Sequence, residues 1–195
     1  MKAFQTVRSV AVPLPRANVD TDQILPMPFL QKPRSDNFGQ YLFHAIRRDD
    51  QGRMRDDFVF NHPQYALARI VVAGPNFGCG SSREHAVWAL ADAGFQVVIA
   101  PSFGDIFYGN CLKNGVLPVR LSPTHVEILF QQLAENPRAL IKVDLDTQTV
   151  HATGLSIGFE IDPFSKHCLL KGLDQIDDTL TLLNDIEAYE QRIAS

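Results

Sequence analysis

The stretch Gly74-Pro-Asn-Phe-Gly-Cys-Gly-Ser-Ser-Arg-Glu-His85 places three glycines, two serines, an arginine and a histidine between two segments with regular patterns. Residues 68–73 before it form a short apolar run rich in β-branched side chains, and residues 82–93 after it carry apolar side chains at helical spacing. A second apolar run, residues 96–100, follows directly. This order predicts a βαβ unit of an α/β protein. The glycine loop is expected at the carboxyl end of the first strand, where open α/β sheets bind ligands.

The composition of this loop favours a small anion. Ser81 is followed three residues later by Glu84, the spacing of a capping box, so Ser81 is the predicted N-cap of the helix. The N–H groups of a first helical turn attract anions, and Arg83 adds a guanidinium suited to a carboxylate or a phosphate. A dinucleotide fingerprint would need glycine in place of Arg83, a P-loop would need a lysine, and a nucleophile elbow would need glycines flanking a serine. A carboxylate ligand is therefore favoured over a nucleotide.

The three cysteines, Cys79, Cys111 and Cys168, form no Cys-x-x-Cys pair and have no spacing suited to an iron–sulfur cluster. We therefore expect no metal site within this chain alone. An odd number of cysteines argues against a disulfide framework and indicates a reducing compartment. Cys79 is interpreted as a small residue that fits a tight loop, with a nucleophile paired to His85 as the alternative.

Length and composition are those of one compact domain. The chain has 195 residues, 45% of them hydrophobic, which is enough to bury a core. Its net charge of −4 argues against nucleic acid or an anionic membrane as a partner. The first residues contain no continuous apolar region typical of an export signal, and no apolar run approaches the length of a membrane span. These features predict a soluble cytoplasmic protein.

The remaining segments have local patterns of helices, strands and loops. Residues 31–64 are charged and weakly periodic, typical of a lid, a binding surface or a partly disordered segment. Gly115 follows one helical pattern at the position of a C-terminal cap, and Ser122 precedes another. The expected elements are a strand at 4–12, a loop at 13–22, a helix at 103–114, a strand at 116–121, a helix at 122–136, a β-hairpin at 139–159 and a mostly helical tail at 164–195 that packs through Leu169, Leu170, Leu173 and Ile176.

Three separated segments, residues 18–26, 76–85 and 99–118, resemble in the same order the isopropylmalate dehydratase small-subunit family of the aconitase superfamily. The similarity extends from about Val7 to Ile176. It implies that residues 1–195 form a single swivelling β/β/α domain that closes over an active site shared with a large subunit. It also implies that a 4Fe-4S cluster is supplied by that subunit. The implied reaction is the interconversion of 2-isopropylmalate and 3-isopropylmalate through 2-isopropylmaleate, a step of leucine biosynthesis.

The resemblance also implies roles for individual residues. Ser81 corresponds to the base that removes the carbon-bound proton, and Ser82 and Arg83 to groups that bind the substrate carboxylates. Asp20 and Thr21 are expected to line the substrate site, and residues 31–64 to contact the large subunit. Independently of the resemblance, the charged and weakly periodic sequence of residues 31–64 leads us to predict disorder of this segment in the free subunit. The backbone of the glycine loop would form an anion hole, contributed by Gly78, Cys79 and Gly80. Substrate specificity would depend on Met27, Pro28, Phe29, Leu30 and Gln31.

Several positions depart from the family pattern and keep other substrates open. Met27-Pro28 stands where a basic or amide pair is common, Ile46 replaces an aromatic residue, Val87 a proline and Gly104 an alanine. A related hydro-lyase acting on citramalate or citraconate, dimethylmalate or homoaconitate is the first alternative, since a pocket discriminates one methylene by only about 1–3 kcal/mol. A stand-alone cysteine or serine hydrolase and a non-catalytic carboxylate-binding module are more distant alternatives.

Physical chemistry indicates that the isolated chain is inactive. Bringing a serine alkoxide near neutrality takes more than about 4 kcal/mol, because the pKa of serine lies above the roughly 10 of tyrosine. A helix N-terminus supplies about 2 kcal/mol at best. The remainder would have to come from Arg83, from the N–H groups of the glycine loop and from exclusion of water on closure.

Overall fold

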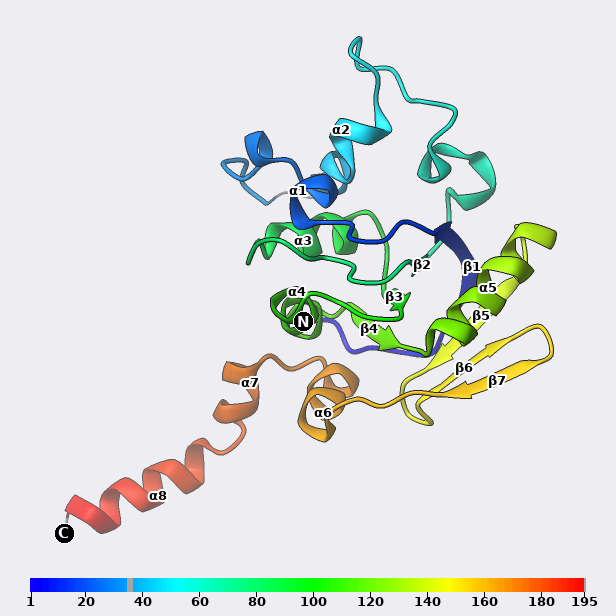
Figure 1. Ribbon diagram of the computed structural model, residues 1–195. Helices are drawn as coiled ribbons and strands as arrows, with labels where there is room; N and C mark the ends of the chain where they lie inside the picture. The colour runs from blue at the N-terminus through cyan, green and yellow to red at the C-terminus, as the bar shows by residue number, and fades with distance from the viewer. Residues whose placement is uncertain (35–36, 195) are drawn as a thin grey trace.

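The computed structural model describes residues 1–34 and 37–194 and shows a curled seven-stranded sheet, in the order β4-β3-β2-β1-β5-β6-β7 (Figure 1). The first four strands along the chain are parallel and the remainder of the sheet is antiparallel. This arrangement confirms the predicted α/β class. The strands are β1 (Val7–Leu14), β2 (Ile70–Ala73), β3 (Val97–Ala100), β4 (Leu117–Arg120), β5 (Leu140–Asp144), β6 (Thr149–Ala152) and β7 (Leu155–Gly158).

The parallel half of the sheet is built by strand–helix–strand connections. Helix α3 (His85–Asp92) joins β2 to β3, and α4 (Asp105–Lys113) joins β3 to β4. Gly115, with φ of 76°, follows α4 as the sequence predicts. Helix α5 (Pro123–Glu135) begins after Ser122, whose side chain accepts a hydrogen bond from the N–H of His125. The connections therefore place the loops that follow β1, β2 and β3 at one edge of the sheet.

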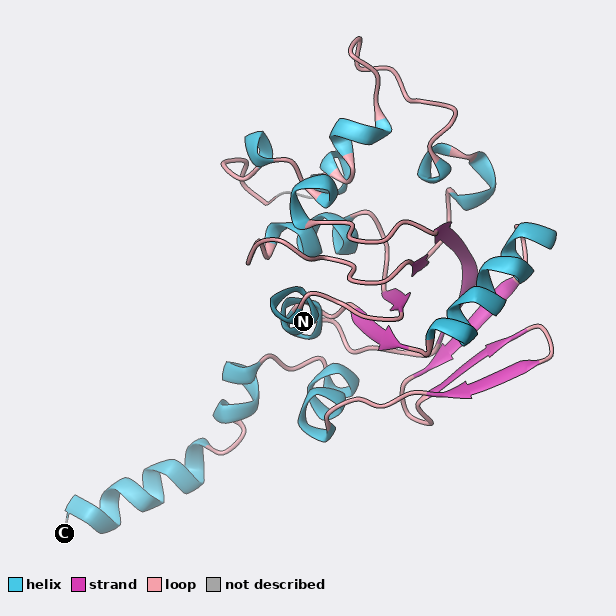
Figure 2. Cartoon of the chain, viewed as in Figure 1, coloured by secondary structure: helices cyan, strands magenta, loops and turns pink. Residues whose placement is uncertain are grey.

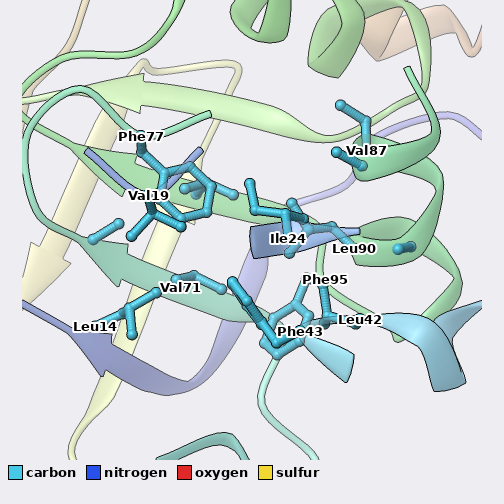
Figure 3. Close-up of a cluster of buried hydrophobic side chains, with 14 of the residues drawn as sticks. Leu14, Val19, Ile24, Leu42, Phe43, Val71, Phe77, Val87, Leu90 and Phe95 are labelled. Carbon is cyan, nitrogen blue, oxygen red and sulfur yellow. The ribbon is translucent and has the colours of Figure 1, made fainter. Parts of the chain in front are cut away.

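Successive side chains of the buried strands point to opposite faces of the sheet, and this divides the core into two clusters. Val71 and Ala73 of β2 point into a cluster beneath α3, whereas Ile70 and Val72 point into a second cluster beneath α5. Figure 3 shows the first cluster, in which Leu14 and Val71 from the sheet lie with Phe43 and Leu90 from the covering segments. Parallel strands are continuously apolar because both of their faces are covered in this way.

The long connection between β1 and β2 forms short helices and loops on one side of the sheet (Figure 2). Within the predicted segment 31–64, residues 35 and 36 lie outside the described part of the chain. Phe38, Phe43, Phe58 and Phe60 are buried, so much of this segment belongs to the core. Disorder of this segment in the free subunit stays a prediction. It is most compatible with the packing at residues 50–57, because these residues are exposed. The short helices here are α1 (Thr21–Ile24), η1 (Met27–Phe29), η2 (Phe38–Tyr41), α2 (His44–Arg47), η3 (Val59–Asn61) and η4 (Pro63–Tyr65).

The C-terminal third differs from the sequence prediction in two respects. The predicted hairpin at 139–159 is a three-stranded meander, because two tight turns, not one, interrupt it. The tail is helical, as predicted, but Ile176 does not pack: it is 71% exposed, since α7 and α8 extend away from the body in Figure 1. Residue 195 lies outside the described chain. The tail comprises α6 (Pro163–Lys171), α7 (Gln175–Leu180) and α8 (Leu183–Ala194).

Candidate functional site

The three segments that carry the sequence motifs lie side by side beyond the ends of β1, β2 and β3. The N–H of Gly78 donates to the carbonyl of Val19 at 2.7 Å, and the N–H of Thr21 donates to the carbonyl of Cys79 at 2.9 Å. On the other side, the N–H of Phe77 donates to the carbonyl of Ser102 at 3.1 Å. The parallel pairing of the strands thus continues into the loops and brings the motifs to one edge of the sheet.

Ser81 is bonded to Thr21 instead of capping a helix. Its hydroxyl lies 2.7 Å from Thr21 Oγ1, and its backbone N–H donates to the same oxygen at 3.3 Å. Helix α3 starts only at His85, with Glu84 as the N-cap residue and no side-chain cap hydrogen bond. The predicted capping box is therefore wrong, because the tertiary contact with Thr21 takes the polar groups of Ser81. Ser81 itself is exposed and Thr21 is buried.

Arg83 points back to the first motif, where it forms an ion pair with Asp22. The side chain of Arg83 is 22% exposed and that of Asp22 is 59% exposed. Asp22 also accepts a hydrogen bond from the N–H of Met27 at 3.1 Å. One carboxylate thus connects the guanidinium to the start of the predicted specificity segment.

Asp20 has a structural role in this arrangement. Its carboxylate accepts a hydrogen bond from the N–H of Gln23 at 2.7 Å and caps α1. A lining role toward a substrate stays a prediction for Asp20, whereas Asp22 is the acidic residue that contacts Arg83.

The glycine loop borders a shallow open depression of about 240 Å³. Gly78 has φ of 73° and Gly80 has φ of 97°, conformations that side chains rarely adopt. The opposite wall is the first turn of α4. The depression suits a small acid in volume, and its lining residues are Gly78, Cys79, Gly80, Ser81, Gly104, Asp105, Ile106 and Phe107.

The predicted specificity segment is divided between solvent and packing. Met27 is 64% exposed, and Pro28 and Gln31 are exposed as well. Phe29 instead stacks on Tyr41, with ring centroids 4.4 Å apart. Leu30 is also packed against the core. The segment is therefore anchored by Phe29 and Leu30 and presents Met27 outward.

No hydrogen bond between Cys79 and His85 is found in residues 1–34 and 37–194, and the His85 ring lies 4.3 Å from that of Trp88. Cys111 is fully buried, and burial raises the pKa of its thiol well above its usual value. Over the same described residues, no three His, Cys, Asp or Glu side chains are grouped as metal ligands. Nor is any helix of that part both long and apolar enough to cross a membrane.

Sequence reasoning gave no role to an asparagine pair that holds the loops together. Asn76 Nδ2 donates to Asn18 Oδ1 at 2.8 Å, and the N–H of Asn76 donates to Ser102 Oγ at 2.9 Å. Both asparagines have positive φ, 55° for Asn18 and 58° for Asn76. The sequence feature that could have indicated this pair is the presence of an asparagine in each motif. Asparagine tolerates the left-handed conformation better than most residues.

Comparisons with known proteins show the family of the chain. The family model of the aconitase C-terminal domain matches residues 1–124, and a second model, described as LeuD_N, matches residues 127–163. The 3-isopropylmalate dehydratase small subunit of Magnetococcus marinus is 50% identical over an aligned length of 202 residues, and the alignment covers 98% of this chain and 95% of that protein. The crystal structure of 3-isopropylmalate dehydratase (leuD) from Methanocaldococcus jannaschii is 26% identical, with a TM-score of 0.67, over 95% of this chain and 99% of that one. The chain belongs to the 3-isopropylmalate dehydratase small-subunit family, within the aconitase superfamily.

Proposed function

We propose that this chain is the small subunit of a two-chain 3-isopropylmalate dehydratase, in which Ser81 is the base and Arg83 binds a substrate carboxylate. The observation that carries the proposal is the convergence of the three motif loops, which places Ser81 beside Thr21 and Arg83 beside Asp22. Family membership supports the reaction class, a dehydration and rehydration of a 2-hydroxy di-acid. The exchange of a hydroxyl between adjacent carbons requires a base for the carbon-bound proton, and Ser81 supplies it.

Activation of Ser81 depends on closure of the site. An alkoxide near neutral pH costs more than about 4 kcal/mol relative to serine in water. Since α3 starts four residues after Ser81, its dipole contributes little of this energy. Ser81 is also exposed in the single chain, where water screens every nearby charge. Docking of the whole domain, residues 1–195, onto the large subunit excludes this water and strengthens the remaining interactions.

Substrate binding is assigned to the groups around Ser81. Arg83 offers further guanidinium N–H groups besides the one that donates to Asp22, so it can bind a carboxylate while Asp22 holds its orientation. Ser82 is exposed next to it and adds a hydroxyl donor. The backbone of Gly78, Cys79 and Gly80 lines the depression and is proposed as the anion hole.

The partner and the cofactor follow from the family. The described residues of this chain do not provide a ligand set for a metal cluster. We assign the 4Fe-4S cluster to the large subunit, where it supplies Lewis-acid chemistry for the departing hydroxide. The present chain contributes the base and the carboxylate-binding groups from the opposite side of the shared site.

The decisive test is anaerobic turnover with and without the cluster-loaded large subunit, followed by the ultraviolet absorbance of the unsaturated product. We expect 3-isopropylmalate to react only with both chains present, and Ser81→Ala to lower kcat by at least about 100-fold. Ser122→Ala, which removes the cap of α5 and changes no residue that lines the depression, is the matched control and should leave kcat unchanged. Activity of the lone chain, or full activity of Ser81→Ala, would contradict the proposal.

The same assay compares citramalate with 3-isopropylmalate as the substrate. Met27-Pro28 stands where a basic or amide pair is common in the family, and Met27 is exposed with its N–H bonded to Asp22. A preference for citramalate over 3-isopropylmalate would assign the chain to a related hydro-lyase and leave the roles of Ser81 and Arg83 intact.

A further inference from the structure

The contact between Thr21 and Ser81 has a defined hydrogen-bond order. Thr21 Oγ1 accepts the backbone N–H of Ser81 at 3.3 Å and lies 2.7 Å from Ser81 Oγ. A threonine hydroxyl has one proton to donate and two lone pairs. The accepted N–H uses one lone pair, so the proton of Thr21 remains available to Ser81 Oγ. While Ser81 is neutral, either hydroxyl can be the donor.

Ionisation of Ser81 removes this ambiguity, because an alkoxide has lone pairs only. The 2.7 Å contact then persists as a hydrogen bond only if Thr21 donates. We propose that Thr21 is the positioning residue of the base: it donates its proton to Ser81 Oγ and stabilises the alkoxide, and it does not contact the substrate. This inference rests on the proposed role of Ser81.

The protons balance along this sequence. Ser81 gives up its proton to the solvent that its side chain contacts before the domain closes, and the alkoxide is stabilised once closure excludes this water. The alkoxide then takes the carbon-bound proton of the substrate, and the electron pair of that C–H bond stays on the substrate. Thr21 keeps its own proton throughout and changes only from a possible acceptor to an obligatory donor.

The fold holds Thr21 in place for this task. It is 1% exposed, the N–H of Thr21 donates to the carbonyl of Cys79 at 2.9 Å, and the carbonyl of Thr21 accepts from Leu25 at 2.9 Å. A β-branched side chain also has few rotamers to lose. Burial keeps competing water away from the hydroxyl, and it separates Thr21 from the depression in which a substrate would lie. The donor is thus oriented before the charge develops, which is the arrangement that stabilises a developing anion most effectively.

The test is the pH dependence of kcat/KM in the complete two-subunit enzyme. Activity rises with pH as the base loses its proton, so a higher pKa of Ser81 moves the acidic limb upward. At pH values below this limb, we expect Thr21→Val to lower kcat/KM by about 10- to 150-fold, the effect of losing one hydrogen bond to a charged group. We also expect the limb to move upward by about one to two pH units. Thr21→Val keeps the other titratable and charged side chains near the site, namely Asp20, Asp22, Cys79, Arg83, His85 and Asp105.

Two further variants make the outcome decisive. Thr21→Ser keeps the hydroxyl and should restore the limb and most of kcat/KM. Thr21→Ala removes the hydroxyl without adding a methyl group in its place, and it decides the matter if Thr21→Val fails to assemble. An equal loss at every pH, with no shift of the limb in either hydroxyl-free variant, would overturn the inference and leave Thr21 a purely structural residue.

The same experiment separates this inference from the proposed function. Full activity of Ser81→Ala would overturn the assignment of the base itself. Loss of activity in Ser81→Ala together with an unshifted limb in Thr21→Val would retain Ser81 as the base and reject only the role of Thr21.

Discussion

Replacing Gly78 with alanine tests whether the glycine loop is held against α4 as tightly as the structure requires. Gly78 has φ of 73°, and a Cβ built there would lie within 2.6 Å of three ring atoms of Phe107. That ring is buried and packs edge-on against Phe77, with centroids 5.4 Å apart, so it has little room to move. The substitution therefore combines backbone strain with overpacking.

The expected loss of stability is the sum of the backbone strain and the overpacking. A left-handed conformation costs an alanine about 1–2 kcal/mol, and overpacking a filled core costs about 1–3 kcal/mol. Gly78→Ala should therefore lower the free energy of unfolding by about 2–5 kcal/mol. In the assembled enzyme it should also lower kcat, because the loop that carries Ser81 must move away from Phe107.

Two other glycines provide matched controls. Gly94 has φ of 95° with nothing within 4 Å of a built Cβ, so Gly94→Ala should show the strain alone, about 1–2 kcal/mol. Gly109 lies inside α4 with no close neighbour, and Gly109→Ala should stabilise the chain by about 0.5–1 kcal/mol. The assay is urea unfolding of the free subunit. If Gly78→Ala costs no more than Gly94→Ala, the contact with Phe107 does not constrain the loop and the reasoning is refuted.

Two more substitutions test the electrostatics of the chain. Asp22→Ala removes the partner of Arg83, and because this ion pair is partly exposed we expect KM to rise by at most about fivefold, with kcat unchanged in steady-state kinetics. An unchanged KM would contradict a role of Asp22 in orienting Arg83. The N–H of Thr147 is the main cause that lowers the pKa of Asp144 from 3.8 to about 2, so this carboxylate stabilises the fold above pH 4 and ceases to do so as the pH falls through 2. Asp144→Asn should therefore be less stable than the parent at pH 7, and the difference in urea unfolding should shrink between pH 4 and pH 2; a difference independent of pH would contradict this assignment.

Elements with local signals were predictable from the sequence. Ser122 caps α5 as expected, and Gly115 adopts a positive φ after α4. The apolar runs of β2 and β3 form the two neighbouring strands in the middle of the parallel half of the sheet. These features depend on residues within a few positions of one another, so the pattern of side chains contains the information.

Predictions failed where a distant contact outweighed a local preference. Ser81 has the spacing of a capping box, yet Thr21 binds both its hydroxyl and its N–H, and the helix starts at His85. Ile176 has the periodicity of a packed residue, but the direction of the tail leaves it exposed. In both cases the outcome depends on where another part of the chain lies, which periodicity does not describe.

The sequence by itself determined the fold class and the family and predicted which residues carry the chemistry, because motifs and apolar patterns are local. Only the tertiary structure decided how those residues pair. Thr21 and Ser81 are 60 positions apart, and Asp22 and Arg83 are 61 positions apart. Their meeting depends on the parallel register of β1 and β2, in which Leu14 lies beside Ala73 and both following loops leave the same edge of the sheet. Register is set by the packing of the whole core, so neither pairing can be obtained from the motifs alone.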